Sequence, residues 1–176
     1  MKLRSLVAAA AALMMMAGAS QAAVIDKGAY GFRLKTVQQI AAPPAKVFKA
    51  IGEWGQWWDG DHSYSGKASN ITLVLQANAC LCETVPGGGS VRHGVVALVL
   101  PNQMIRLHTA LGPLQDEGVS GAMLFTLKAK DGGTELTTTY NVGGARDLIV
   151  SAAPGVDGIL TAGMARLKRY VETGKP

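Results

Sequence analysis

Apolar and polar positions alternate near the start of the chain in the way that a half-buried strand requires. Between residues 30 and 40, Phe32 and Leu34 share one parity, whereas Arg33 and Lys35 fall on the other. Successive side chains of a strand point to opposite faces, so this spacing predicts a strand over that range with one face in the core.

A short helix is predicted next, over residues 45–52. Val47 and Ile51 lie at helical spacing, and Pro44 fits the first helical position because the N–H that it lacks would be unbonded there. Glycines interrupt the pattern after this point. The aromatic, turn-rich segment from Trp54 to Gly66 is therefore predicted to be mostly irregular.

Period-two patterns return between residues 70 and 142, separated by turn signals such as Asp131-Gly132-Gly133. Short connections of this chemistry suit hairpins, so the sheet is expected to be mainly an antiparallel meander. Six further strands are predicted: Ile71 to Ala77, Cys80 to Val85, Arg92 to Leu100, Met104 to Leu111, Gly118 to Lys130 and Thr134 to Val142.

The last apolar pattern is helical, from about Asp147 to Glu172, with Gly174 placed as a C-terminal stop. Pro154 indicates either a kink in the first turns or a regular helix that begins there. The predicted fold is α+β: a curved seven-stranded antiparallel sheet wrapped around a long C-terminal helix, with short helices after the first strand. A cavity is expected between sheet and helix.

The first 22 residues have the three-part order of a secretory signal peptide. Lys2 and Arg4 precede an apolar run from Leu6 to Ala17, and Ser20-Gln21-Ala22 supplies a cleavage site. The run is shorter than the roughly 20 residues that cross a bilayer as a helix, so no stable membrane span is expected. We expect cleavage after Ala22, export to the periplasm or the medium, and one domain over residues 23–176.

Charge and motif content exclude several function classes. The net charge of +5 falls to +3 once Lys2 and Arg4 are removed, and the remaining basic residues are scattered, so no nucleic-acid function is expected. Asp59-Gly60-Asp61 starts like a calcium loop, but Tyr64 stands where such a loop needs glycine. We expect no metal site and no cofactor. The sequence specifies no oligomeric state.

Several segments resemble the SRPBCC superfamily, the START and pollen-allergen-like helix-grip fold, in its polyketide cyclase-like branch. The resemblance covers essentially the whole mature chain and implies the helix-grip fold and an apolar ligand held between sheet and helix. Some similar members are related to chaperone-ATPase activator domains. The segments that carry the resemblance are Ala42-Pro43-Pro44-Ala45-Lys46-Val47-Phe48, Trp57-Trp58, Leu111-Gly112-Pro113-Leu114-Gln115, Gly132-Gly133-Thr134-Glu135-Leu136-Thr137, and Val156-Asp157 with Leu167.

Cys80 and Cys82 form the one chemically distinctive pair. Residues two apart in a strand are about 6.6 Å apart, at the edge of the range for a disulfide. Two buried thiols packing as small hydrophobes are therefore the favoured interpretation, with a strained disulfide that could act as a redox pair, or a soft-metal site, as alternatives. Glu83 has the opposite parity. The same interpretation turns the cysteines inward and Glu83 to solvent; otherwise Glu83 becomes a candidate general base.

The histidines show no metal-ligand spacing. His108 is predicted to face water, because it shares the parity of Arg106. If Leu100 pairs with Met104 around a three-residue loop, His93 lies opposite Leu111 and points into the cavity. A structural role for His93 and an acid–base role are both open.

Three hypotheses about function follow. The first is an exported binding module for a small hydrophobic or amphipathic ligand, lipid or polyketide-like. The second is a cyclase- or hydratase-like enzyme acting on a carbonyl compound, with His93, Glu83 or Tyr140 as acid or base. The third is a partner-binding domain with a filled cavity and an aromatic contact surface over Trp54 to Tyr64. The predicted ligand-binding residues are Phe32, Leu34, Trp57, Trp58, His93, Leu107, Met123, Phe125, Tyr140, Ile159 and Met164.

Overall fold

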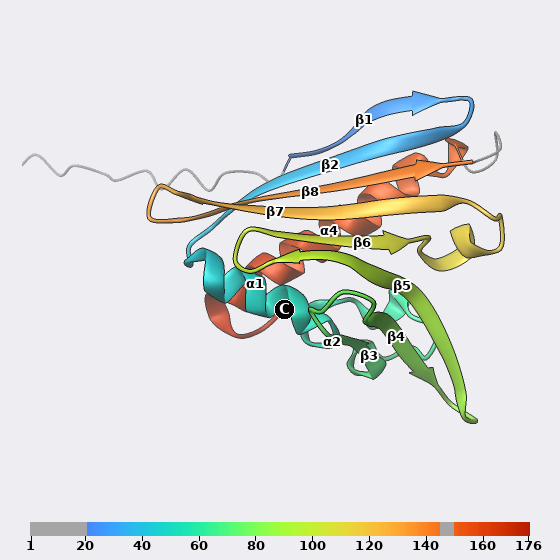
Figure 1. Cartoon of the computed structure of the whole chain (residues 1–176), viewed down its shortest axis with the longest axis horizontal. Helices are drawn as coiled ribbons and strands as arrows, with labels where there is room; N and C mark the ends of the chain where they lie inside the picture. The colour runs from blue at the N-terminus through green and yellow to red at the C-terminus, as the bar shows by residue number, and fades with distance from the viewer. Residues whose placement is uncertain (1–20, 145–149) are drawn as a thin grey trace, which may run out of the picture.

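The computed structural model describes residues 21–144 and 150–176, and they form one antiparallel sheet with helices on one side (Figure 1). The predicted signal peptide lies outside the described residues except for its last two, which belong to the first strand. No helix in the described part of the chain combines the length and apolar character needed to cross a membrane.

The elements run in the order β, β, short helices, six strands, long helix. Their bounds are β1 Gln21–Gly28, β2 Gly31–Ile40, α1 Pro44–Gly52, α2 Trp54–Trp57, η1 Gly60–His62, η2 Ala68–Asn70, β3 Ile71–Leu73, β4 Cys80–Val85, β5 Gly89–Leu100, β6 Met104–Thr109, η3 Gly112–Gln115, β7 Ser120–Lys130, β8 Gly133–Gly143 and α4 Ala153–Thr173.

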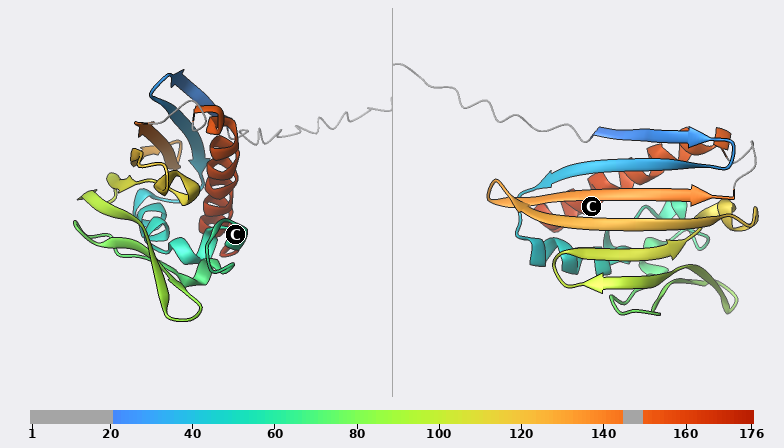
Figure 2. Two further views of the ribbon diagram at one scale, coloured as in Figure 1. Left: turned by 90° about the vertical axis from the view of Figure 1, so that its right-hand side faces the viewer. Right: turned by 45° about the horizontal axis from the view of Figure 1, so that its top comes forward.

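Eight strands form the sheet, in the spatial order β1-β2-β8-β7-β6-β5-β4-β3, and each described pairing is antiparallel. The meander from β3 to β8 is therefore confirmed, and β2 joins it by pairing with β8. Figure 2 shows the sheet curving around α4, which lies on its concave side. The α+β helix-grip architecture is confirmed. Strands of the curved sheet lie along one side of α4.

The prediction of seven strands was wrong, because β1 precedes them and the short helices follow the second strand. β1 is an edge strand that pairs only with β2. Its register shifts between Val24 and Asp26, and most of its described side chains are exposed. A bulged edge strand buries no alternating apolar face, so the sequence carries little period-two signal there.

Local sequence explains where the other elements begin and end. Asp131 and Gly132 take positive φ values of 50° and 74°, the conformation of a two-residue hairpin turn between β7 and β8. Gly174 ends α4 with φ 79°, as predicted. Pro154 lies in the first turn of α4, so the regular helix begins there; the predicted start, at residues 147–149, lies outside the described residues.

A cluster of three tryptophans fills the space between α2, α4 and the sheet. The ring centroids of Trp54 lie 4.7 Å from Trp57 and 5.2 Å from Trp58. The Trp57 indole N–H donates to the carbonyl of Ala50 over 2.8 Å. Arg166 of α4 donates to the carbonyls of Trp57 and Trp58 over 2.8 and 3.2 Å. These bonds fix a segment that was predicted to be irregular, because buried indoles need partners for their N–H groups.

Candidate functional site

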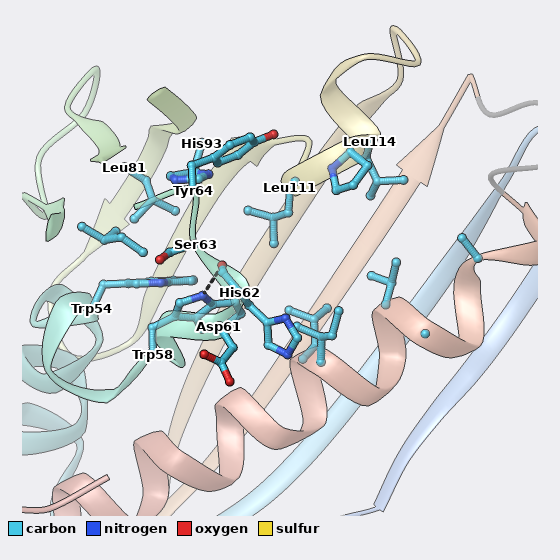
Figure 3. Close-up of a pocket in the computed structure, with 18 of the residues that line it drawn as sticks. Trp54, Trp58, Asp61, His62, Ser63, Tyr64, Leu81, His93, Leu111 and Leu114 are labelled. Carbon is cyan, nitrogen blue, oxygen red and sulfur yellow. Dashed lines mark hydrogen bonds between the residues drawn. The ribbon is translucent and has the colours of Figure 1, made fainter. Parts of the chain in front are cut away.

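A cavity of about 900 Å³ lies between the N-terminal half of α4, the segment from α2 to η1, and the sheet end near η3 (Figure 3). This volume is within the range of small-molecule sites. Most of the described lining is apolar. The lining residues are Trp54, Trp58, Asp61, His62, Ser63, Tyr64, Ile71, Leu81, His93, Leu111, Gly112, Pro113, Leu114, Glu117, Ser151, Ala152, Gly155, Val156, Ile159 and Leu160.

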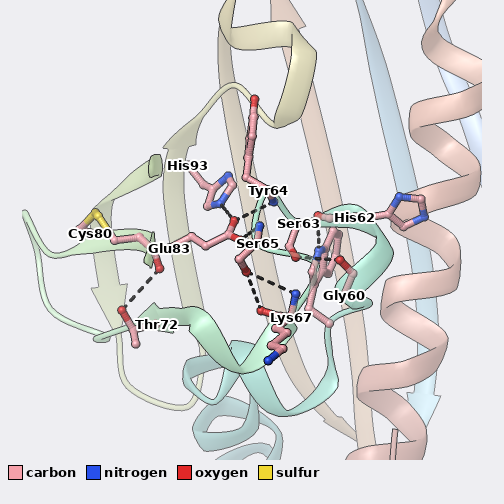
Figure 4. Close-up of polar contacts among 12 residues, drawn as sticks. Gly60, His62, Ser63, Tyr64, Ser65, Lys67, Thr72, Cys80, Glu83 and His93 are labelled. Carbon is pink, nitrogen blue, oxygen red and sulfur yellow. Dashed lines mark hydrogen bonds and ion pairs between the residues drawn. A yellow bond between two sulfur atoms is a disulfide. The ribbon is translucent and has the colours of Figure 1, made fainter. Parts of the chain in front are cut away.

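A buried carboxylate and a buried imidazole meet at one wall of this cavity. Glu83 is 1 % exposed and His93 is 7 % exposed. The His93 Nε2 atom lies 2.8 Å from Glu83 Oε2. Figure 4 shows the contact together with the segment that closes over it. The exposed ring of Tyr64 lies over the imidazole, with centroids 5.9 Å apart.

A β-bulge lies beside this contact. Leu81 pairs with Gly94 and Cys82 pairs with Arg92, so His93 is an extra residue in β5. A bulged residue leaves the regular alternation, and both His93 and Gly94 are buried as a result. Val91 pairs with Glu83, so His93, two residues along β5, lies on the same face as the carboxylate, and the bulge adds Gly94 to that buried side.

Backbone donors complete the environment of the carboxylate. The N–H groups of Ser65 and Tyr64 donate to Glu83 Oε1 and Oε2 over 2.6 and 3.2 Å. Burial by itself raises the pKa of Glu83, but the hydrogen bonds from Ser65, His93 and Tyr64 outweigh it and hold this pKa below its ordinary value. Glu83 is therefore ionised at neutral pH.

The favoured interpretation of β4 was wrong. Glu83 points inward, and Cys80 and Cys82 are joined by a disulfide rather than held as two buried thiols. Their Cα atoms are 5.2 Å apart, closer than in a regular strand, which brings the pair within disulfide range. The desolvation cost that argued against a buried carboxylate is offset by three hydrogen-bond donors, which the strand pattern does not reveal.

The expected pairing around His93 was also partly wrong. Leu100 pairs with Met104 as predicted, but the β5–β6 register shifts between Val96 and Leu98. Gly94 therefore faces Thr109, and His93 is not opposite Leu111. His93 nevertheless lines the cavity, as predicted. His108 is exposed, as predicted.

Tyr140 lies in the core beneath the cavity wall. Its hydroxyl donates to the Thr109 carbonyl over 3.3 Å and accepts from the Leu111 N–H over 3.2 Å. Burial raises the pKa of Tyr140 to about 12. With both hydrogen-bonding roles used by backbone groups, Tyr140 holds the end of β6 against η3.

Three of the predicted ligand-binding residues line the cavity: Trp58, His93 and Ile159. The others are buried, and in the described part of the chain they lie outside the lining; they are Phe32, Leu34, Trp57, Leu107, Met123, Phe125, Tyr140 and Met164. Alternation identifies which side chains point inward, but it does not separate those packed under the middle of α4 from those at its open end.

Sequence reasoning missed the lining contributed by loops and short helices. Ser63 and Tyr64 follow η1, Leu111 precedes η3, and Leu114 lies within η3. Such segments have no hydrophobic period to read. Two or more exposed rings in the aromatic segment would favour the partner-binding hypothesis, but its three tryptophans are buried and Tyr64 is exposed, so the structure does not favour it.

Comparison with known families gives one match over most of the chain. The family model described as "Polyketide cyclase / dehydrase and lipid transport" matches residues 32–172. This range includes the cavity-lining segments and nearly all of β2 and α4. Comparison with curated proteins gives no match.

Solved structures of low sequence identity share the fold. Protein MLL2253 from Mesorhizobium loti has a TM-score of 0.61 at 19% identity, covering 82% of this chain and 99% of its own. The Aha1 dimer from Colwellia psychrerythraea has a TM-score of 0.60 at 16% identity, covering 82% and 98%. DynU16, a protein of the dynemicin biosynthetic locus, has a TM-score of 0.60 at 19% identity, covering 82% of this chain and 48% of its own.

Proposed function

Because this chain belongs to the polyketide cyclase, dehydrase and lipid-transport family, we propose that it is a binding module for a small hydrophobic or amphipathic ligand, lipid or polyketide-like. The ligand occupies the cavity between the sheet and the N-terminal half of α4. The cavity of about 900 Å³, walled mainly by apolar side chains, is the observation that carries this proposal. Burial of apolar ligand surface supplies the binding free energy.

Export is part of the same proposal. Residues 1–22 carry the features of a signal peptide, and a carrier outside the cytoplasm would meet hydrophobic molecules released by other cells or membranes. Measuring the N-terminus of the protein recovered from each cell fraction tests this part. Protein found only in the cytoplasm with Met1 intact would contradict it.

Native mass spectrometry of the purified protein tests ligand binding, followed by titration with N-phenyl-1-naphthylamine, an apolar probe whose fluorescence rises in dry sites. We expect a bound apolar adduct or saturable probe binding. The matched variants are Gly155→Trp and Gly158→Trp. Both glycines lie on α4, and a β-carbon on either meets no atom within 4 Å.

Gly155 lines the cavity, whereas Gly158 is not in the described lining. Gly155→Trp is therefore expected to fill the cavity and reduce probe affinity by about tenfold or more, while Gly158→Trp retains it. An apo protein that binds no probe, or equal loss in both variants, would remove the binding module as the function.

A second function, catalysis, is favoured by one observation, the contact between Glu83 and His93 at the cavity wall. An ionised carboxylate that orients an imidazole is a common arrangement for a general base. His93 Nδ1 would take a proton from the carbon next to a ligand carbonyl and return it to the enolate. Deuterium exchange into 2-tetralone tests this step: wild-type protein is expected to accelerate it and His93→Gln to abolish the acceleration. Equal rates with and without wild-type protein would exclude it.

A further inference from the structure

The protonation of the His93 ring follows from its partner. The Glu83 carboxylate is ionised and can only accept hydrogen bonds, so the proton of the 2.8 Å contact sits on His93 Nε2. In the neutral ring the other nitrogen, Nδ1, then carries a lone pair and acts as an acceptor. The carboxylate also strengthens this acceptor by polarising the ring.

This second nitrogen has no partner among the hydrogen bonds that the described residues form. Figure 4 shows it on the edge of the ring away from Glu83. His93 belongs to the cavity lining, whereas Glu83 stands behind it and is not in that lining. The residue as a whole is 7 % exposed, so most of it is shielded from bulk water. Because His93 lines the cavity, a ligand there can reach this acceptor and donate a hydrogen bond to it.

Charges around the cavity limit what that ligand can be. Besides His93, the titratable groups of the described lining are two carboxylates, Asp61 and Glu117, one further histidine, His62, and Tyr64; neither lysine nor arginine is present. A ligand carboxylate or phosphate would approach these groups and the ionised Glu83 without a cationic partner. The polar group of the ligand is therefore best neutral, and it must donate a hydrogen bond.

We propose that the cavity selects neutral apolar molecules that carry a hydroxyl group, a phenol or an alcohol, which donates to Nδ1 of His93. This inference rests on the proposed binding function and assigns its ligand class. Leu81 and Leu111 flank the same wall and would contact the carbon skeleton next to the hydroxyl.

Isothermal titration with three naphthalene derivatives of similar size tests the inference. 2-Naphthol offers the donor, 2-methoxynaphthalene retains the oxygen but lacks the donor, and 2-naphthoate carries a negative charge. On the wild-type protein we expect 2-naphthol to bind about tenfold more tightly than 2-methoxynaphthalene, and 2-naphthoate to bind most weakly.

The variants His93→Phe and His108→Phe then locate the effect. His108 is exposed on the outer face of β6, so His108→Phe is expected to keep the tenfold preference, whereas His93→Phe loses it and binds the two neutral compounds equally. Equal binding of the neutral pair to the wild-type protein would overturn the inference and leave the binding function in place. A preference that survives His93→Phe, or tightest binding of 2-naphthoate, would also overturn it. Failure of all three compounds to bind would overturn both proposals.

Discussion

Gly163 of α4 lies directly against the indole ring of Trp58. A β-carbon at position 163 would come within 2.6 Å of Trp58 Cζ3 and 3.2 Å of Cε3. Trp58 is held from two sides, because its indole N–H donates to the His62 carbonyl over 3.0 Å and its own carbonyl accepts from Arg166. The ring therefore has little freedom to retreat, and it forms part of the cavity wall.

Gly163→Ala is expected to destabilise the protein by about 1–3 kcal/mol, although alanine is the better helix former. It also displaces Trp58 and weakens binding of the apolar probe. Urea denaturation followed by tryptophan fluorescence measures the first effect. Gly158→Ala on the same helix is the control, since a β-carbon there meets open space and is expected to stabilise by up to about 1 kcal/mol. Equal stability changes in the two variants would contradict the close packing.

The low pKa of Glu83 makes stability depend on pH. In the folded protein its pKa lies below the ordinary value, so the unfolded chain binds a proton first as pH falls. The stability that Glu83 contributes is present above the roughly pH 4.3 of an unfolded glutamate and is lost as pH drops through the folded pKa. In denaturation series between pH 3 and 7, the free energy of unfolding should therefore fall more steeply with decreasing pH for the wild-type protein than for Glu83→Gln.

The control is Glu135→Gln, which removes an exposed pair with Lys130. Surface pairs contribute little, so this variant should keep the steep acid limb of the wild-type protein. At neutral pH, Glu83→Gln should cost about 1–3 kcal/mol, because an amide cannot accept three donors as well as a carboxylate. An acid limb in Glu83→Gln that matches the wild type would show that the carboxylate is not held as the structure indicates.

Sequence reasoning reached the architecture because long elements repeat their pattern. β8 alternates Leu136 and Tyr140 in the core with Glu135 and Asn141 outside it, and the register to β7 follows. The edge strand β1 was missed, because its described side chains are mostly exposed. Alternation of apolar and polar residues arises where one face of a strand is buried, and this edge strand buries few side chains.

The site was harder to predict, because it depends on departures from regular structure. His93 contacts Glu83 beside a bulge in β5. The cost of burying Glu83 is offset by His93 and by backbone N–H groups of Tyr64 and Ser65, which come from a loop far away in sequence. Alternation along β4 does not show which face is buried. On sequence grounds Glu83 belongs on the solvent face, because burying an isolated carboxylate is costly in free energy. The sequence does not reveal the partners that remove this cost.

The Cys80–Cys82 disulfide closes a very short loop. The chain-entropy model therefore assigns it roughly 1–2 kcal/mol, less than the bridges that close long loops. The double variant Cys80→Ser, Cys82→Ser should lose about this much stability and keep probe binding. Alkylation before and after reduction, read by mass spectrometry, measures the thiols directly. Two thiols that react without reductant would contradict the bridge.

Tyr140→Phe tests whether the core supports the cavity wall. The hydroxyl of Tyr140 joins the Thr109 carbonyl to the Leu111 N–H, and Thr109 Oγ1 in turn donates to the His93 carbonyl over 2.5 Å. Removing one hydroxyl leaves both backbone groups without this partner, so a loss of about 1–3 kcal/mol is expected.

The matched control is Tyr30→Phe, because Tyr30 is 82 % exposed and its change should stay within about 0.5 kcal/mol. Ligand affinities distinguish a positioning role of Tyr140 from a direct role in ligand selectivity. If Tyr140 only positions Leu111 and Thr109, Tyr140→Phe weakens 2-naphthol and 2-methoxynaphthalene by the same factor and leaves their ratio unchanged. A change in that ratio would contradict a purely supporting role and would mean that the Tyr140 hydroxyl also affects the acceptor on His93, to which it is linked through Thr109.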